Sequence, residues 1–453
     1  MNVSTTLNKC VPYFLRPHLD RLQASPLAYR LVRGAFWSLA GAVISRGLGL
    51  LASILVARML GKEGFGELGI IQSTVGMFGV FAGFGLGLTA TKHVAEFRAK
   101  DPAKAGRIIS LSELVAVGTG ATAALILFLL APWLATHTLA APHLAGLLRI
   151  AAIMLFLGAL NGAQTGALAG FEAFKTIARL NLLAGIAAFP LMVGGVYLAG
   201  LKGAVWGLVA SMGVNWLLNR MAIKDEARSA GVPFSFSGCM QEYHILWDFS
   251  VPALLASAMV GPVNWACNAM LVNQPNGYAE MGIFNAANQW YGAMLFLPGV
   301  LGQVVLPMLS EGVAVNDRAR AIKTLTLSIK LNAVFVTPLL ALSCIFSPLI
   351  MKSYGESFSG TWPTLIVVLL TAGLLAVQTP VGHIIAAAGR MWTGCLMNVG
   401  WALAYIGITA LIVNWGALGV ATARAGAYLL HATWTFGFAY GMTKKIGTLR
   451  AND

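Results

Sequence analysis

Two arginines within long apolar stretches are the residues of this sequence best suited to bind a charged ligand. Arg46 lies near the middle of the stretch 34–60. Arg424 lies in a C-terminal apolar stretch, and Tyr428 and His431 follow at spacings that place all three side chains on one helix face. An arginine at the centre of a bilayer costs about 3 kcal/mol, so we expect each to supply a fixed positive charge inside the protein. An internally paired, structural role is the alternative for both.

Acidic residues are almost absent from the apolar stretches. No Asp lies deep in one, and Glu113 is the Glu that lies within one, near its end. A pathway for cations needs buried carboxylates, whereas a pathway for anions needs Arg or Lys. The guanidinium group also matches phosphate through two parallel hydrogen bonds. The pattern favours an anionic substrate and leaves Glu113 and His383 as candidates to carry a coupling ion, although His383 could equally be a hydrogen-bonded core residue.

Amide side chains supply further polar groups within the apolar stretches. They are Gln72, Asn161, Gln164, Asn285, Asn288 and Gln289. In a cavity they could bind sugar hydroxyls, whereas between helices they would hydrogen-bond one helix to another, which is their commoner use. We include them in the predicted substrate-binding set with the two arginines, Tyr428 and His431, and interhelical bonding stays the alternative.

The composition is that of a polytopic membrane protein. Hydrophobic residues make up 58% of the chain and charged residues 10%, whereas soluble proteins carry about 25% charged residues. The net charge of +14 is then a property of loops on one side of a membrane, and nucleic acid is not an expected partner. The five cysteines show no metal-binding spacing, and no Walker, HExxH or GxSxG motif occurs. We expect no metal, cofactor or catalytic residue, and energy from an ion gradient (protons or sodium), the membrane potential or the substrate's own gradient.

Hydropathy predicts an all-α chain with about twelve membrane spans. They are 34–57, 68–90, 109–131, 147–169, 177–199, 203–221, 249–271, 282–306, 327–350, 362–387, 392–413 and 416–440. Lys and Arg concentrate in the connections that share a side with both chain ends, which predicts that both termini are cytoplasmic. The connections on the opposite side are nearly all short.

Short matches in the same order indicate an internal duplication. The segment 64–70 (GFGELGI) matches 277–283 (GYAEMGI), and 203–205 matches 416–418, each pair 213 positions apart; 169–170 and 388–389 form a third pair. An even number of spans per half gives both halves the same orientation, related by an axis along the membrane normal. We therefore predict six-helix bundles at 34–221 and 249–441 around a central cavity, with cytoplasmic segments at 1–33, 222–248 and 442–453.

Two such bundles can rock against each other around a shared site, and this favours a transporter over a membrane enzyme. The segment 56–108, VARMLGKEGFGELGIIQSTVGMFGVFAGFGLGLTATKHVAEFRAKDPAKAGRI, resembles the oligosaccharide-flippase branch of the multidrug/oligosaccharidyl-lipid/polysaccharide exporter superfamily, above all in the pattern ARxLGxxxFGxxG. The segment 249–257, FSVPALLAS, is a second match.

This resemblance implies two six-helix lobes and transfer of a polyprenyl-pyrophosphate-linked glycan from the inner to the outer leaflet of a bacterial cytoplasmic membrane. It also implies a cationic cavity, which Arg46 and Arg424 fit, and contact with membrane lipid and other polysaccharide assembly proteins. The drug-exporter branch typically carries a buried acid in its first span, where this chain has Arg46. An ion-coupled antiporter of drugs or organic ions is the main alternative, and a scaffold of a glycan assembly complex is a more distant one.

Overall fold

The computed structural model describes residues 26–234, 236–251, 254, 258–314, 317–388 and 390–445, and these residues form helices and turns without a strand among them. The first group of helices is α3 (Pro26–Gly83), α4 (Leu86–Phe97), α5 (Pro102–Trp133), α6 (Ala145–Gly170) and α7 (Phe174–Ser229). The second group is α9 (Val260–Val272), α10 (Gly277–Met294), α11 (Phe296–Ala314), α12 (Arg318–Ile345), α13 (Ser347–Ser353), α14 (Trp362–Ala387), α15 (Met391–Ile412) and α16 (Gly416–Lys445). We call these groups the N-terminal lobe and the C-terminal lobe.

Helix breaks and caps recur in the two lobes. Asp101 caps the N-terminus of α5 by accepting a hydrogen bond from Lys104 N at 2.9 Å, and Asp317 caps α12 in the same way. Gly200, which breaks α7, and Gly416, the first residue of α16, have φ values of 54° and 65°, a region that favours glycine. The two lobes therefore share an aspartate helix cap and a glycine of positive φ at a helix boundary.

Seven helical stretches of the described residues are long and apolar enough to cross a membrane. Phe174–Ser229 and Trp392–Gly441 each contain two predicted spans, and Val43–Phe97 contains the predicted span 68–90 and most of 34–57. Gly61, with φ 70°, divides Val43–Phe97, and Gly200 divides Phe174–Ser229. The predicted spans 249–271 and 282–306 are not among the seven stretches, because the first includes residues outside the described ones and the second changes helix at Leu295.

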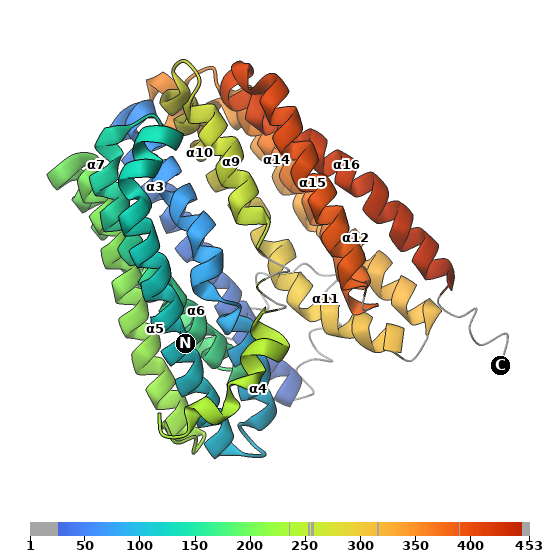
Figure 1. The fold of residues 1–453 in the computed structure, drawn as a ribbon. Helices are drawn as coiled ribbons and strands as arrows, with labels where there is room; N and C mark the ends of the chain where they lie inside the picture. Colours follow the sequence, from blue (N-terminus) through green and yellow to red (C-terminus); the bar gives the residue numbers. More distant parts are fainter. Residues whose placement is uncertain are drawn as a thin grey trace.

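Figure 1 shows the two lobes side by side, approaching each other where α10 passes α3 and diverging towards α4 and α11. We call the first of these regions the contact end and the second the far end. The all-α, two-lobed fold predicted from the sequence is confirmed. The predicted segment limits stay predictions, and residues 1–25 and 446–453 lie outside the described residues.

The repeated glycine motif forms the closest approach between the lobes. A Cβ atom added at Gly66 of α3 would lie 1.8 Å from the carbonyl oxygen of Tyr278 on α10. A Cβ atom at Gly282 would lie 2.1 Å from the carbonyl oxygen of Lys62. Only glycine allows two helix backbones to come this close. The two copies of the motif therefore pack against each other at the contact end.

Hydrogen bonds also join the two lobes at the contact end. Arg58 Nε donates to the Ser353 carbonyl oxygen at 2.6 Å, and the Tyr278 hydroxyl donates to the Leu139 carbonyl oxygen at 2.7 Å. Burial raises the pKa of Tyr354 to about 12, so its hydroxyl stays neutral. These contacts join segments from both lobes and hold this end closed.

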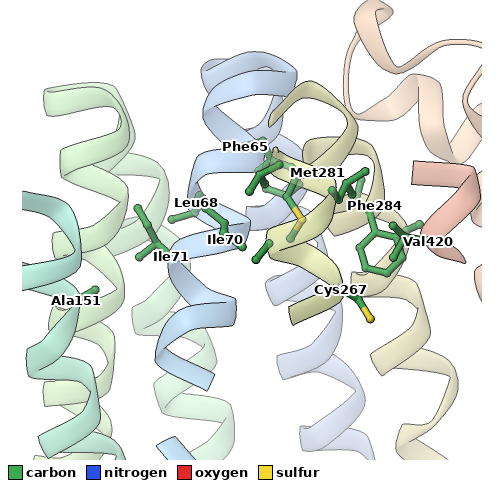
Figure 2. Packing of buried hydrophobic residues seen from close by; sticks show 14 of the residues in the cluster. Phe65, Leu68, Ile70, Ile71, Ala151, Cys267, Met281, Phe284 and Val420 are labelled. Atoms are coloured by element: carbon green, nitrogen blue, oxygen red, sulfur yellow. The ribbon is translucent and has the colours of Figure 1, made fainter. Parts of the chain in front are cut away.

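The largest hydrophobic core is continuous across both lobes. Figure 2 shows Phe65 and Ile70 of α3 facing Met281 and Phe284 of α10, with Val420 of α16 beyond them. All five side chains are at most 3% exposed. Burial of this size stabilises the contact end by dispersion and close packing.

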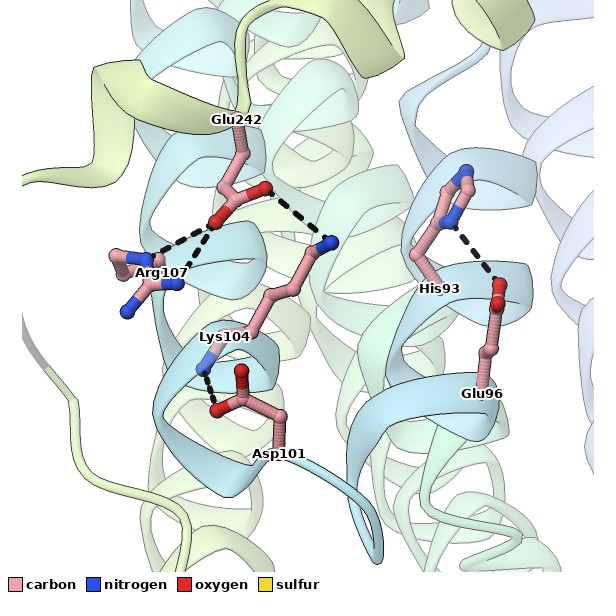
Figure 3. A network of polar contacts seen from close by, with 6 residues as sticks. All are labelled: His93, Glu96, Asp101, Lys104, Arg107 and Glu242. Atoms are coloured by element: carbon pink, nitrogen blue, oxygen red, sulfur yellow. Dashed lines mark hydrogen bonds and ion pairs between the residues drawn. The ribbon is translucent and has the colours of Figure 1, made fainter.

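The chain between the lobes folds back on the N-terminal lobe at the far end. Glu242 accepts hydrogen bonds from Arg107 Nε and Nη2 at 3.1 and 2.8 Å, and Lys104 Nζ lies 3.8 Å away (Figure 3). Glu242 is buried. The predicted segment 222–248 therefore begins within α7 and continues as a structured connection.

Candidate functional site

A cavity of about 620 Å³ lies among α3, α6 and α7, and α10 and α11 of the other lobe form part of its wall. Four of the predicted substrate-binding residues line it: Arg46, Gln72, Asn161 and Gln289. The N-terminal lobe thus supplies most of the surface, and the C-terminal lobe contributes one side through Gln289, Ala293 and Phe296.

Arg46 supplies the positive charge of this cavity. Its side chain is exposed, and its guanidinium carbon lies 5.6 Å from the centre of the Phe296 ring. Among the described residues that line the cavity there is no Asp or Glu. A guanidinium group without a neutralising carboxylate leaves its hydrogen-bond donors available to an anion. The cavity is therefore suited to a negatively charged ligand.

Uncharged polar groups line the same cavity as Arg46. They are Ser45, Ser53, Gln72, Asn161, Asn181, Ser211, Asn215 and Gln289. Such hydroxyl and amide groups can donate to and accept from sugar hydroxyls. One charged group among many neutral polar groups fits a ligand with an anionic part and a larger uncharged polar part.

The local packing explains why these groups face the cavity. The Ser45 hydroxyl donates to the Asn181 carbonyl oxygen at 3.0 Å, and a Cβ atom at Gly185 would lie 2.4 Å from that hydroxyl oxygen. This glycine therefore allows α7 to cross α3 closely at the level of Arg46. Ser211 and Asn215 are four residues apart on α7, which places both on one helix face.

Asn161 and Asn285 have the interhelical role. Asn161 lines the cavity, yet its Nδ2 donates to the Met212 carbonyl oxygen at 3.1 Å. Asn285 Nδ2 donates to the Phe65 carbonyl oxygen at 3.3 Å across the contact between the lobes. Gln164 is buried, and its amide atoms have no hydrogen-bond partner among the described residues.

Arg424 does not line this cavity. Its side chain is 3% exposed within the C-terminal lobe, and Nη1 donates to Asn288 Oδ1 at 2.9 Å. The rings of Tyr291 and Phe284 lie 4.3 and 5.0 Å from its guanidinium carbon. Tyr428 packs near it, so the structure gathers the predicted residues into two separate groups.

His431 and the two coupling candidates also have protein neighbours. His431 Nδ1 is hydrogen-bonded to the Gln378 side chain. Glu113 accepts hydrogen bonds from Arg220 Nη1 at 2.8 and 2.7 Å, forming an ion pair. His383 packs against Gly302, where a Cβ atom would lie 2.6 Å from the ring. None of the three lines the cavity of Arg46.

The polar residues of α7 were not among those predicted from the sequence. Asn181, Ser211 and Asn215 lie inside predicted spans, and the spacing of the last two was a usable signal. Ser45 and Ser53 were equally visible, eight positions apart around Arg46. Serine is common in membrane helices as a small packing residue, so its presence alone is a weak indication of a binding site.

Known proteins resemble this chain over most of its length. The profile of the family described as "Polysaccharide biosynthesis protein" matches residues 31–313. The chain is 25% identical over 429 residues to the "EPS I polysaccharide export inner membrane protein EpsE" of Ralstonia nicotianae (strain ATCC BAA-1114 / GMI1000), covering 90% of this chain and 94% of that protein. It is 25% identical over 424 residues to the "Succinoglycan biosynthesis transport protein ExoT" of Rhizobium meliloti (strain 1021), covering 91% of this chain and 80% of that protein.

Solved structures share the fold at low sequence identity. An inward-facing multidrug resistance MATE family transporter of the MOP superfamily matches with a TM-score of 0.76 and 15% identity, covering 91% of this chain and 98% of that one. An outward-facing structure of such a transporter matches with a TM-score of 0.68 and 16% identity, covering 91% of this chain and 96% of that one. The lipid II flippase MurJ in an inward closed conformation matches with a TM-score of 0.67 and 16% identity, covering 89% of this chain and 87% of that one.

Proposed function

The chain belongs to the polysaccharide biosynthesis protein family, and we propose that it moves a lipid-linked oligosaccharide across a bacterial cytoplasmic membrane. The proposed substrate carries its glycan on a polyprenyl diphosphate and passes from the inner to the outer leaflet. The transport functions in the names of EpsE and ExoT support this proposal. Both termini are then cytoplasmic, because the Lys- and Arg-rich connections share their side.

The single observation that carries this proposal is the charge of the cavity. Arg46 is exposed to it, and the part of the lining that the structure describes contains no carboxylate. In the proposed complex, Arg46 holds the diphosphate through charge-assisted hydrogen bonds. The amides and hydroxyls of α3, α6 and α7 hold the sugars, and the polyprenyl chain stays in the lipid. The prediction that Arg424, Tyr428 and His431 also contact the diphosphate stays a prediction.

We further propose that the structure corresponds to the inward-facing state. The contacts between Gly66 and Tyr278 and between Gly282 and Lys62 then close the external side. The higher TM-score against the inward-facing transporter supports this assignment. Transport would require these contacts to separate while the far end closes, so that the cavity opens to the external side and no longer to the inner side.

The test is an analysis of the lipids of a bacterial strain that lacks the gene. We expect polyprenyl-diphosphate-linked glycan to accumulate in the inner leaflet. The wild-type gene should relieve the accumulation, and Arg46→Ala should fail to do so at an equal protein level. Arg149→Ala is the matched control, because Arg149 is exposed and does not line the cavity.

Two outcomes would contradict the proposal. If the deletion strain accumulates no glycolipid but becomes sensitive to organic cations, the chain is a drug exporter. If Arg46→Ala restores transport as fully as the wild type, the anionic part of the substrate binds elsewhere.

A further inference from the structure

The interior of the C-terminal lobe contains buried hydrogen-bond donors that have no partner among the described residues. They are Arg424 Nε and Nη2, Trp401 Nε1 and the Tyr405 hydroxyl. Arg424 and Trp401 are 3% exposed, and Tyr405 is fully buried. The Tyr405 hydroxyl lies beside the Cys267 sulfur but makes no hydrogen bond of normal geometry with it. A buried donor without a partner is costly, so a group of them in one region calls for a ligand.

These donors come from two neighbouring helices and form one connected cluster. Trp401 and Tyr405 are four residues apart on α15, with ring centres 5.8 Å apart. Tyr428, one turn after Arg424 on α16, lies 5.3 Å from the Trp401 ring. Arg424 is also close enough to Tyr405 and Tyr428 to act on both hydroxyls electrostatically. The Tyr291 ring of α10 also lies against the Arg424 guanidinium group, so the donors belong to one packed cluster of α10, α15 and α16.

The charge of this cluster is not balanced by the described residues. Arg424 forms no ion pair with a described carboxylate, and its hydrogen-bond partner Asn288 is neutral. Arginine does not lose its proton in proteins, so burial cannot neutralise it. Rings of Tyr291 and Phe284 near the guanidinium group lower its energy only in part. A buried cation needs a counter-charge to offset the loss of water.

The internal repeat gives a reason for such a site. By the offset of 213, Arg424 corresponds to Ser211, which lines the cavity of the N-terminal lobe. The equivalent region of the C-terminal lobe is instead filled by the aromatic residues Tyr291, Trp401, Tyr405 and Tyr428. Because rings occupy this region, we take the partner of these donors to be a small ion.

We propose that the C-terminal lobe binds one small monovalent anion, chloride, at Arg424. Arg424 supplies the charge, and the Trp401 Nε1–H and Tyr405 O–H groups donate hydrogen bonds to the same ion. The ion neutralises the guanidinium group and fixes α15 against α16. This site is separate from the cavity of Arg46, so it stands whether or not the chain transports a glycolipid.

The test measures the melting temperature of the full-length protein in detergent. Sodium chloride is exchanged for sodium gluconate at constant sodium concentration and ionic strength. A ligand that binds only the folded state raises Tm in a saturable way, and we expect a rise of at least about 2 °C. Crystals soaked in bromide should show an anomalous peak beside Arg424. An unchanged Tm, or a bromide peak that is absent, would overturn the proposal.

Variants of the cluster test whether the rise of Tm with chloride comes from binding at Arg424, Trp401 and Tyr405. Arg424→Gln should abolish the chloride dependence, and Arg149→Gln, which removes an exposed charge outside the cluster, should keep it. Trp401→Phe and Tyr405→Phe keep a ring and remove one donor, so each should weaken chloride binding about tenfold even if Arg424→Gln fails to fold. A chloride response that survives both ring variants would refute the site.

A third arm separates chloride from the phosphate of a substrate. Inorganic pyrophosphate is added to the wild-type protein and to Arg424→Gln. We expect no competition with bromide at Arg424. If pyrophosphate displaces bromide there, the cluster belongs to the route of a diphosphate, and the chloride assignment is wrong.

Discussion

Gly66→Ala is the sharpest test of the contact between the lobes. The added Cβ atom would lie 1.8 Å from the Tyr278 carbonyl oxygen, whereas ordinary contact begins near 3.4 Å. The obstacle is backbone, which cannot rotate away as a side chain can. The two helices would have to separate by about 1.6 Å, and overpacking of this kind costs about 1–3 kcal/mol. Because the cost falls only on the conformation in which α3 and α10 touch, the population should move towards the other conformation.

The expected shift follows from this cost. A change of about 1–3 kcal/mol alters the ratio of two conformations by about 5- to 150-fold. Spin labels at Ser229, at the end of α7, and at Trp392, near the start of α15, would report it by pulsed electron resonance, because both residues are exposed at the far end. We expect a new population with a shorter distance between the labels in Gly66→Ala.

Gly76→Ala is the matched control, because it lies on the same helix and its added Cβ atom would meet nothing within 4 Å. Its distance distribution should equal that of the wild type. If Gly66→Ala folds and gives the wild-type distribution as well, the contact does not control the conformation, and the proposed inward-facing assignment loses its mechanical basis.

Three further predictions concern the cavity, the ion pair and the closed end. Arg46→Lys should slow glycolipid transport about tenfold through loss of the bidentate contact, measured by export at equal protein level; an unchanged rate would mean that a point charge suffices. Glu113→Gln should lower the free energy of unfolding by about 2 kcal/mol, because it leaves Arg220 unpaired. The double variant Glu113→Gln with Arg220→Gln should recover part of the loss in Tm. No change in Tm would show that the pair is not formed. Gly69→Cys with Asn285→Cys should form a disulfide that blocks transport until it is reduced. The two Cβ atoms lie 3.1 Å apart and need to separate only slightly to reach the usual disulfide spacing of about 3.5–4.5 Å. Free transport under oxidising conditions with the bond formed would refute the need for opening at this end.

The sequence could predict those parts of the fold in which placing a residue in the wrong environment costs much free energy. Arg46 was identifiable because a charge in an apolar stretch is expensive, and the structure exposes it to a cavity. The two lobes were predictable from the repeat, whose glycine motif proves to be the contact between them. In each case, a residue type has few acceptable environments.

The neutral amides could not be assigned in the same way. Asn161 and Asn285 have the same chemistry and lie at similar depth in predicted spans, yet the first lines the cavity and the second joins the lobes. Helical periodicity gives the face of a residue but not the helix that this face meets. The difference is set by the crossing of α3 with α10 and α7, which depends on glycines whose partners lie far along the chain.

Arg424 shows the same limit for a charged residue. Its sequence environment is like that of Arg46, and cost alone predicts a functional role for both. The structure separates them, because Arg46 faces an open polar cavity and Arg424 is enclosed by Phe284, Tyr291 and other rings. If the lobes descend from one duplicated unit, their interiors have since diverged. The N-terminal lobe keeps space for a large polar ligand, whereas the C-terminal lobe has filled the equivalent space and retained a single cation, which is why its interior calls for a small anion.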